Sequence, residues 1–173
     1  MMRFQNHYLK RRPDFYLYPS TSHRISENID YQFRSLKDHE FRRMKRGFDE
    51  HTTDNGVKVQ SADRFTIVAT ENDDFIGCAS GLAYKNMDEY SGWFYLTDLF
   101  VEKFTRLKGI GAVLLSRLEE IIRHKGVKNI WTWTAGYEAP GFYKKQGYKV
   151  FADLENWYSD GSSRIALRKN LLI

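Results

Sequence analysis

The stretch that decides the fold runs from Leu99 to Ala112 and reads LFVEKFTRLKGIGA. It begins with apolar residues, continues with basic ones and ends in Gly-x-Gly at the start of an amphipathic run. We therefore predict a strand that ends near Val101, a short basic loop, and a helix that begins at the two glycines. The first N–H groups of a helix have no partner inside it, and its dipole places about half a positive charge there. Glycines leave these groups accessible, so the stretch predicts a phosphate-binding loop.

Two common nucleotide-binding motifs do not fit this loop. A dinucleotide-binding turn needs a third glycine, and Leu114 stands at that position. A P-loop needs Lys and then Ser or Thr directly after its last glycine, where this chain has Ala112 and Val113. The loop therefore indicates a phosphate ligand of another kind. The alternative is an ordinary helix start that contains two glycines.

The hydrophobic pattern on both sides of the loop predicts an α+β fold. Strands are expected at residues 29–34, 64–71, 75–84, 93–101, 128–134, 148–154 and 164–169. One helix is expected from Ser35, with Asp38 as a capping partner, to the Asn55-Gly56 stop; two more are expected over residues 110–125 and 141–146. We predict a mixed, mainly antiparallel central sheet with flanking helices, in the order β-α-β-β-β-α-β-α-β-β.

Length and composition indicate one domain. The chain has 173 residues, of which 42% are hydrophobic and 28% charged. We expect an irregular N-terminal arm over residues 1–28 and a folded domain over residues 29–173. The single cysteine, Cys78, excludes a disulfide within the chain, and the longest apolar run, residues 110–115, is far shorter than the ~18 residues of a membrane span. With no visible secretory signal, these features favour a cytoplasmic protein.

The net charge of +5 is concentrated near the N-terminus. Residues 1–46 carry 11 basic side chains against 5 acidic ones, whereas the rest of the chain is close to neutral. A basic segment of this kind suits nucleic acid, an acidic partner or a phosphorylated ligand, or it forms a solvated helix face. Exposed aromatic residues do not alternate with these charges on a strand, so we do not expect nucleic-acid binding. The histidines and the single cysteine show no metal-ligand spacing, so no metal site is expected either.

Two segments together resemble a known family. Arg106-x-x-Gly109-x-Gly111-Ala112, entered from a Leu-Phe-Val strand, is similar to the acetyl-CoA pyrophosphate loop of the GNAT N-acetyltransferases. Residues 139–148, which read APGFYKKQGY, are similar to that family's Ala-x-x-Phe-Tyr-x-x-x-Gly-Phe/Tyr segment. The two segments stand in the family's order, with an expected helix and strand between them. The resemblance covers residues 29–170 and includes residues 95–101, YLTDLFV, which are similar to a strand of polyamine and aminoglycoside members.

The resemblance implies transfer of an acetyl group from acetyl-CoA to a primary amine, without a metal. In the family two neighbouring parallel strands, here residues 93–101 and 128–134, splay apart, and the acetyl-CoA arm lies between them. A strand N–H near Leu99 would polarise the thioester carbonyl. The acceptor would be a small-molecule or protein amine. The implied cofactor-binding residues are Leu99, Phe100, Val101, Arg106, Leu107, Lys108, Gly109, Ile110, Gly111, Ala112 and Phe142.

Direct attack on the thioester requires a neutral amine. With a pKa near 10.4, only about one alkylamine in 10³ is neutral at pH 7, so a base must take a proton. Asp98 is the only acid on the strand over residues 93–101, and it fits equally as the base or as an anchor for the acceptor's charge. Related family members often carry Glu where this chain has Thr97, which leaves a water-mediated route or a base from another strand open. Tyr143 takes the position of the family's general acid, with a core tyrosine as the alternative.

Other interpretations stay open on the sequence alone. The same fold also suits a non-catalytic module that binds acyl-CoA or a protein partner, and a homodimer is compatible with it. Trp157 and Tyr158 lie between the last two expected strands, in a region that often walls the acceptor pocket in the family. With Glu155 and Asp160 they would hold a cation, or they pack at a strand edge.

Overall fold

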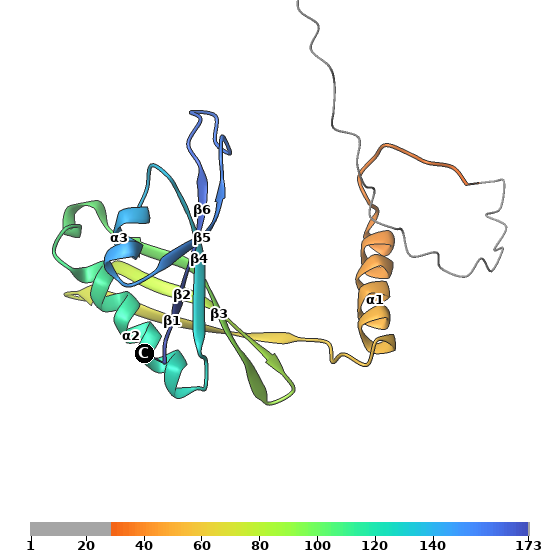
Figure 1. Ribbon diagram of the computed structural model, residues 1–173, viewed down its shortest axis with the longest axis horizontal. Coiled ribbons are helices and arrows are strands. Elements are labelled where there is room, and N and C mark those ends of the chain that lie inside the picture. Colours follow the sequence, from red (N-terminus) through yellow and green to blue (C-terminus); the bar gives the residue numbers. More distant parts are fainter. Residues whose placement is uncertain (1–28, 173) are drawn as a thin grey trace, which may run out of the picture. The chain divides into compact units, whose positions relative to one another are not determined.

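The computed structural model describes residues 29–172 of the chain (Figure 1). The arm expected over residues 1–28 lies outside the described residues, so the domain boundary at residue 28 stays a prediction. The chain divides into two units, and the division falls between Phe41 and Arg42. Among the described residues, no helix is both long and apolar enough to cross a membrane.

Helix α1 (Asp38–Asp54) begins later than expected and is capped by a different residue. The backbone N–H of Lys37 donates to Glu40 Oε2 at 2.7 Å, and Arg34 binds the same carboxylate through Nη1 at 2.7 Å and Nη2 at 2.6 Å. The hydrogen bond from Arg34 is the main reason why the pKa of Glu40 falls to about 2. The cap therefore consists of Lys37 and Glu40, and the expected Ser35–Asp38 pair was wrong.

The strand expected at residues 29–34 was wrong. These residues are exposed and pair with no strand in the described part of the chain. Their polar side chains bind one another instead: Gln32 donates to Asp30 at 2.6 Å, and Arg34 Nε donates to Gln32 at 2.9 Å. An alternating pattern becomes a strand only where a neighbouring strand accepts its backbone hydrogen bonds.

Six strands form one mixed sheet in the order β1-β2-β3-β4-β6-β5, which confirms the predicted α+β fold class. β3 and β4 run parallel, and all other neighbours run antiparallel. Asn72 and Asp73, both with positive φ as in a type I′ turn, form the tight turn that joins β1 to β2. The strands are β1 (Ser61–Glu71), β2 (Asp74–Asn86), β3 (Glu89–Val101), β4 (Asn129–Ala135), β5 (Lys149–Leu154) and β6 (Arg164–Asn170).

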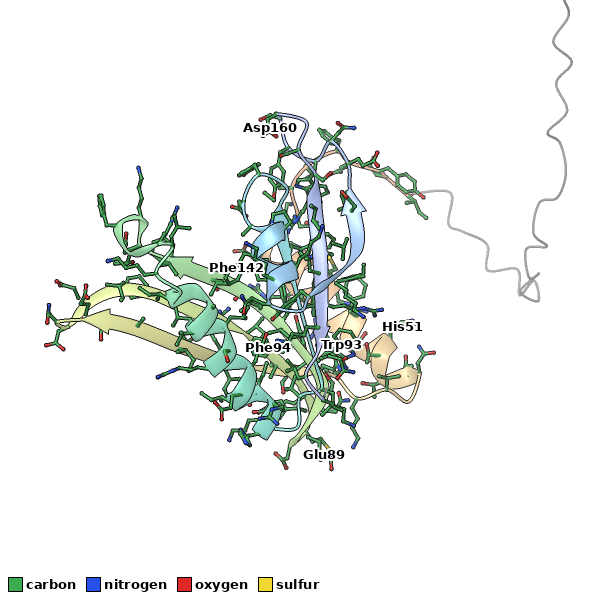
Figure 2. The ribbon with its side chains drawn as sticks, turned by 60° about the vertical axis from the view of Figure 1, so that its left-hand side comes forward. His51, Glu89, Trp93, Phe94, Phe142 and Asp160 are labelled. Carbon is green, nitrogen blue, oxygen red and sulfur yellow. The ribbon has the colours of Figure 1, made fainter. Side chains whose placement is uncertain are left out.

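Two helices cover one face of the sheet (Figure 1). α2 (Ile110–His124) connects β3 to β4, and α3 (Pro140–Lys145) connects β4 to β5. α2 packs its apolar side on the sheet, and Figure 2 shows Phe94 of β3 on that side. The largest fully buried side chains are Phe94, Leu96, Leu115, Leu118, Ile122, Val127, Ile130 and Leu167. The core therefore lies between α2 and the middle of the sheet and fixes the end of β3 against the start of α2.

The other face of the sheet carries aromatic side chains. Tyr95 stacks on Trp131 with ring centroids 4.2 Å apart, and Trp131 contacts Trp133 and Phe151 edge to face. These residues alternate with the core residues of their strands, so they point away from α2. We call the side of the sheet that carries Tyr95, Trp131, Trp133 and Phe151 the aromatic face.

Candidate active site

β3 and β4 are paired only along their first halves. The register includes Trp93 with Asn129 and ends at Tyr95 with Trp131. Beyond that point β3 continues to Val101 and β4 continues to Ala135, each paired with its outer neighbour but not with the other. The two facing backbone edges therefore have free hydrogen-bonding groups. We call this divergence, residues 96–101 against residues 132–135, the strand opening; it is the splayed pair that the resemblance implied.

A β-bulge at Thr97 bends β3 at the start of the strand opening. Ser80 pairs with Asp98 and Gly81 with Leu96, so Thr97 is an extra residue in β3. Thr97 Oγ1 donates to the carbonyl of Ser80 at 3.1 Å, which holds the bulge against β2. A side chain at Gly81 would collide with the Tyr95 carbonyl and the Phe94 ring, so the bend requires glycine there. The bulge accounts for the divergence, because it increases strand twist where pairing with β4 ends.

Tyr143 lies near the end of the strand opening where β3 and β4 begin to separate. Thr132 Oγ1 donates to the carbonyl of Leu96 at 3.0 Å, across the point where β3 and β4 separate, and the Thr132 side chain lies close enough to Tyr143 to affect the pKa of its hydroxyl. Tyr143 is only 6% exposed. Burial raises its pKa to about 12, the Thr132 side chain acts the other way, and the charge of Glu138 adds to the rise. The phenol is therefore neutral and able to donate a hydrogen bond.

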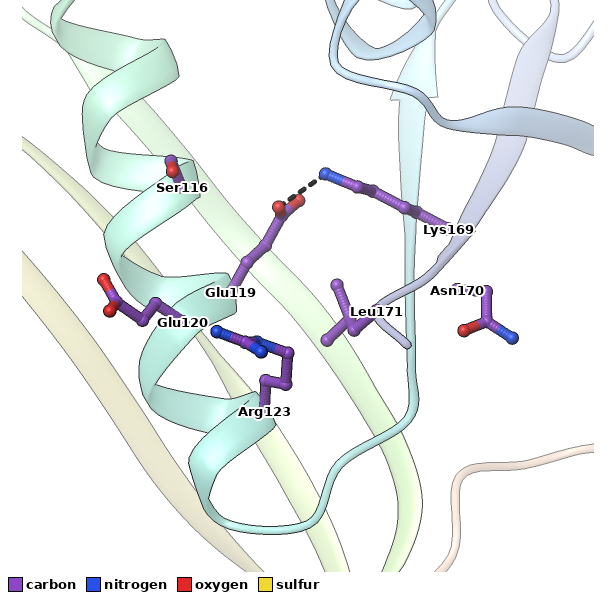
Figure 3. Close-up of a pocket in the computed structure, with 7 residues that line it drawn as sticks. All are labelled: Ser116, Glu119, Glu120, Arg123, Lys169, Asn170 and Leu171. Atoms are coloured by element: carbon purple, nitrogen blue, oxygen red, sulfur yellow. Dashed lines mark hydrogen bonds and ion pairs between the residues drawn. The ribbon is translucent and has the colours of Figure 1, made fainter. Parts of the chain in front are cut away.

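Tyr143 is supported from behind by a second buried tyrosine. The Tyr148 ring packs on the Tyr143 ring at 5.4 Å, and Tyr148 donates to Glu119 Oε1 at 2.8 Å. Lys169 donates to the other oxygen of Glu119 at 2.6 Å, an ion pair that borders a hollow of about 280 Å³ between α2 and β6 (Figure 3). Burial also raises the pKa of Tyr148. These contacts fix the orientation of the Tyr143 ring.

The loop before α2 presents unpaired backbone donors. Gly109 caps the helix with φ of 83°, and its carbonyl accepts from Ala112 at 3.0 Å and Val113 at 3.1 Å. In the described part of the chain, the N–H groups of residues 107–111 have no acceptor. Unlike α1, α2 has no acidic side chain in its first turn. An external anion is therefore the natural partner of these donors.

Other contacts join the loop to the strand opening. Arg106 Nε donates to the carbonyl of Val101 at 2.9 Å, which ties the loop to the end of β3. A Cβ at Gly111 would lie 3.5 Å from Val101 Cγ2 and 3.8 Å from the Phe142 ring, so β3, α2 and α3 meet there. Figure 2 shows Phe142 on the helix-covered side of the sheet. The donors of the loop, the free edge of β3 and Tyr143 thus belong to one continuous site.

The structure gathers most of the predicted cofactor-binding residues around this site. Leu99, Val101, Ile110 and Phe142 pack against the core with their side chains partly buried. The side chains of Leu107 and Lys108 are exposed to solvent, so these two residues contribute to the loop through their backbone N–H groups. Phe100 is different: its ring stacks on Phe75 at 6.0 Å on the other side of the sheet, so only its backbone faces the strand opening.

Asp98 lies on the aromatic-face side of β3, because Leu99 and Val101 point to the core. Its side chain is 58% exposed and accepts a hydrogen bond from Thr97 at 2.6 Å. Arg64 of β1 lies 3.5 Å from Asp98 Oδ2 and also donates to Ser80 Oγ at 2.9 Å. Sequence reasoning missed Arg64, since its contact with Asp98 depends on the register of three strands. Asp98 and Tyr143 therefore face opposite sides of the sheet, with the strand opening between them.

The aromatic residues Trp157 and Tyr158 pack on other residues of the chain, as one of the two expected alternatives had it. The Trp157 ring meets the chain's own cation, Arg164, at 5.1 Å, and Tyr158 packs on Tyr137 at 5.4 Å. Asp160 accepts from the backbone and hydroxyl of Ser162 and so closes the turn between β5 and β6. Within residues 29–172, no three His, Cys, Asp or Glu side chains gather closely enough to hold a metal ion.

Comparisons with known proteins agree with this geometry. The model of the acetyltransferase (GNAT) family matches residues 28–148. The chain is similar to the structure of an acetyltransferase from Bacillus cereus, with 23% identity, a TM-score of 0.68, and coverage of 81% of this chain and 97% of that one. No curated protein matches the chain.

Two further solved structures share the fold. An aminoglycoside 6'-N-acetyltransferase complexed with coenzyme A has 22% identity, a TM-score of 0.53, and coverage of 64% of this chain and 74% of that one. Ard1 from Thermoplasma volcanium has 20% identity, a TM-score of 0.52, and coverage of 81% and 83%. The family match spans the strand opening, the loop before α2 and Tyr143, so the chain belongs to the GNAT family of acetyltransferases.

Proposed function

We propose that this protein transfers an acetyl group from acetyl-CoA to a primary amine by direct attack within a ternary complex. The observation that supports it most is the strand opening. The unpaired N–H donors of the loop before α2 follow its β3 edge, and the neutral phenol of Tyr143 lies where β3 and β4 begin to separate. A two-part substrate with a phosphate group and an extended thioester arm fits this arrangement. The free amine would approach from the aromatic face, where Asp98 lies.

The residues fit acetyl-CoA group by group. The N–H groups of residues 107–111 and the cation of Lys108 would hold the pyrophosphate. The free backbone edge of Leu99 to Val101 would pair with the amide groups of the pantetheine arm, as a neighbouring strand would. Phe142 would pack against the arm near Gly111. Arg106 acts on the loop itself, through its bond to Val101.

The reaction balances without a covalent enzyme intermediate. The amine nitrogen forms a bond to the thioester carbonyl carbon, and the carbon–sulfur bond breaks. The nitrogen loses one proton and the sulfur gains one, so the products are an amide and a free thiol. A backbone N–H near Leu99 would stabilise the charge that develops on the carbonyl oxygen. Tyr143 would donate a hydrogen bond to the departing sulfur.

The role of Asp98 is tested by Asp98→Asn, which keeps the shape of the side chain and removes its charge. We expect kcat/KM for a cationic acceptor to fall several-fold. As a base, Asp98 contributes to the chemical step, so its loss lowers kcat. As an anchor it contributes to KM, by up to about fivefold, because exposed ion pairs are worth up to about 1 kcal/mol. Unchanged kcat and KM would remove Asp98 from the site; Asp74→Asn, in the β1–β2 hairpin, is the control.

The alternative is a module of the same fold that binds acyl-CoA without chemistry. Both functions predict acetyl-CoA binding, so binding does not separate them. Thiol release from acetyl-CoA does, when measured with a broad panel of small amines and peptides. We expect the thiol to be released only when an amine is present, in an amount equal to that of the N-acetylated product measured by mass spectrometry. Tight acetyl-CoA binding without thiol release for any amine would favour the module.

A further inference from the structure

Arg164 is held by two tryptophans at the edge of the candidate site. Its guanidinium carbon lies 5.1 Å from the ring centroid of Trp133 and 5.1 Å from that of Trp157. Trp133 belongs to β4, and Trp157 belongs to the segment between β5 and β6. Cation–π contacts of this kind use the flat face of the guanidinium, and its N–H donors point outward in the plane. The two rings therefore hold the cation between β4 and the β5–β6 segment, while its N–H groups remain able to donate hydrogen bonds.

These donors have no acceptor in the part of the chain that the structure describes. Within residues 29–172, Arg164 takes part in no ion pair and no hydrogen bond through its side chain, although it is partly buried. The other β6 cation on this face, Arg168, is exposed. A planar guanidinium that two rings hold in place, and whose donors are free, matches the two coplanar oxygens of a carboxylate.

The position of Arg164 favours a contact with the acceptor over a contact with acetyl-CoA. Arg164 pairs with Ala135, the last residue of β4, where β4 has already separated from β3. Its side chain lies on the Trp133 side of the sheet, which is the aromatic face and the side of Asp98. The loop before α2 belongs to the helix-covered face. The free donors therefore stand at the outer end of the strand opening, on the side from which the amine would approach.

We propose that Arg164 is a specificity-determining residue that binds a carboxylate on the acceptor. The acceptor class is then an amine that carries a carboxylate in the same molecule, such as an amino acid. This inference rests on the proposed transfer to an amine. The carboxylate would bind the edge of the Arg164 guanidinium, while the amine nitrogen points into the strand opening.

Matched acceptors test this proposal directly. Each set contains an amino acid, its amide and its decarboxylated amine, for example L-phenylalanine, phenylalaninamide and phenethylamine, or L-lysine, lysinamide and cadaverine. The panel covers acidic, basic, aromatic and aliphatic skeletons. We expect the wild-type protein to prefer the carboxylate member of its best set by roughly tenfold to hundredfold in kcat/KM, the range for a hydrogen bond to a charged group. Equal kcat/KM across the sets would overturn the proposal.

Arg164→Gln should abolish this preference, and Arg164→Lys should keep only part of it, because lysine lacks the planar pair of donors. Arg168→Gln is the matched control: Arg168 lies on the same strand, over the Phe151 ring at 5.7 Å, beside Trp131, where β3 and β4 are still paired. The Arg168→Gln variant should keep the wild-type preference for the carboxylate acceptor. The preference is a ratio within one protein sample, so partial unfolding of a variant does not alter it. An Arg164→Gln variant that keeps the preference refutes the role.

A binding measurement separates this inference from the proposed function. Trp133 and Trp157 contact Arg164, so tryptophan fluorescence, followed without acetyl-CoA, should change saturably with the amino acid but not with its amide, and Arg164→Gln should remove the change. If carboxylates bind but no amine is acetylated, the proposed function fails and the carboxylate site stands. If amines are acetylated without preference or carboxylate binding, the site fails and the function stands. Saturable binding of inorganic phosphate but not of the amino acids would overturn the assignment to a carboxylate.

Discussion

Replacing Tyr143 with phenylalanine is expected to lower kcat by about 10²–10⁴-fold, the usual effect of losing a general acid. The substitution removes only the hydroxyl group, and the ring keeps its contacts with Phe142 and Tyr148. The fold and the affinity for acetyl-CoA should therefore stay at wild-type level. Single-turnover rates with acetyl-CoA and the best amine measure the chemical step, and calorimetric titration measures the affinity.

The pH dependence sharpens this prediction. Because the pKa of Tyr143 is raised to about 12, the phenol is protonated throughout the ordinary assay range. The variant should therefore keep the shape of the wild-type pH–rate profile at a lower height. Tyr90→Phe is the control, since it also removes a hydroxyl that is bonded inside the protein, to Asp63 at 2.9 Å, but far along β3 from the strand opening. An unchanged rate of the chemical step in Tyr143→Phe would remove Tyr143 from the mechanism.

Replacing Gly111 with aspartate should abolish acetyl-CoA binding and leave the fold intact. The new Cβ would make only ordinary contacts with Val101 and Phe142. A carboxylate in the first turn even favours a helix, through the helix dipole. The same carboxylate would repel a bound pyrophosphate: two like charges about 4 Å apart repel by about 4 kcal/mol at the effective dielectric of a protein surface. We expect the dissociation constant of acetyl-CoA to rise at least about 100-fold, as measured by calorimetry.

Gly111→Asn separates charge from size in this test. Asparagine has the shape of aspartate without its charge, so Gly111→Asn should weaken acetyl-CoA binding less than Gly111→Asp. A melting temperature of Gly111→Asp at or above that of the wild type would show that the fold has survived. Wild-type affinity in a folded Gly111→Asp protein would mean that the pyrophosphate binds elsewhere.

The parts of the site that follow from local sequence were predictable. Gly109 and Gly111, placed after a strand and a short basic stretch and before an amphipathic run, indicated the loop, and the structure has unpaired N–H groups there. The antiparallel hairpin at Asn72 and Asp73 was predictable for the same reason, because both residues tolerate positive φ. Such signals need only neighbouring residues, so a single sequence contains them.

The parts that depend on distant segments were not predictable. Residues 29–34 alternate like a strand, but whether a neighbouring strand pairs with them is decided elsewhere in the chain. The bulge at Thr97 arises from the register between β2 and β3. The cation held by Trp133 and Trp157 is formed by β4, β6 and the segment between β5 and β6, and no spacing in the sequence brings these together. Contacts of this kind appear only when the sheet order is known.

The most direct test of the central claim is an initial-rate study in which acetyl-CoA and the best amine are varied together. Direct transfer in a ternary complex predicts double-reciprocal plots that intersect, with one thiol released for each N-acetylated product. Parallel lines would indicate an acetylated enzyme between two half-reactions, and they would contradict direct attack by the amine. The absence of any amine-dependent thiol release would contradict acetyl transfer itself.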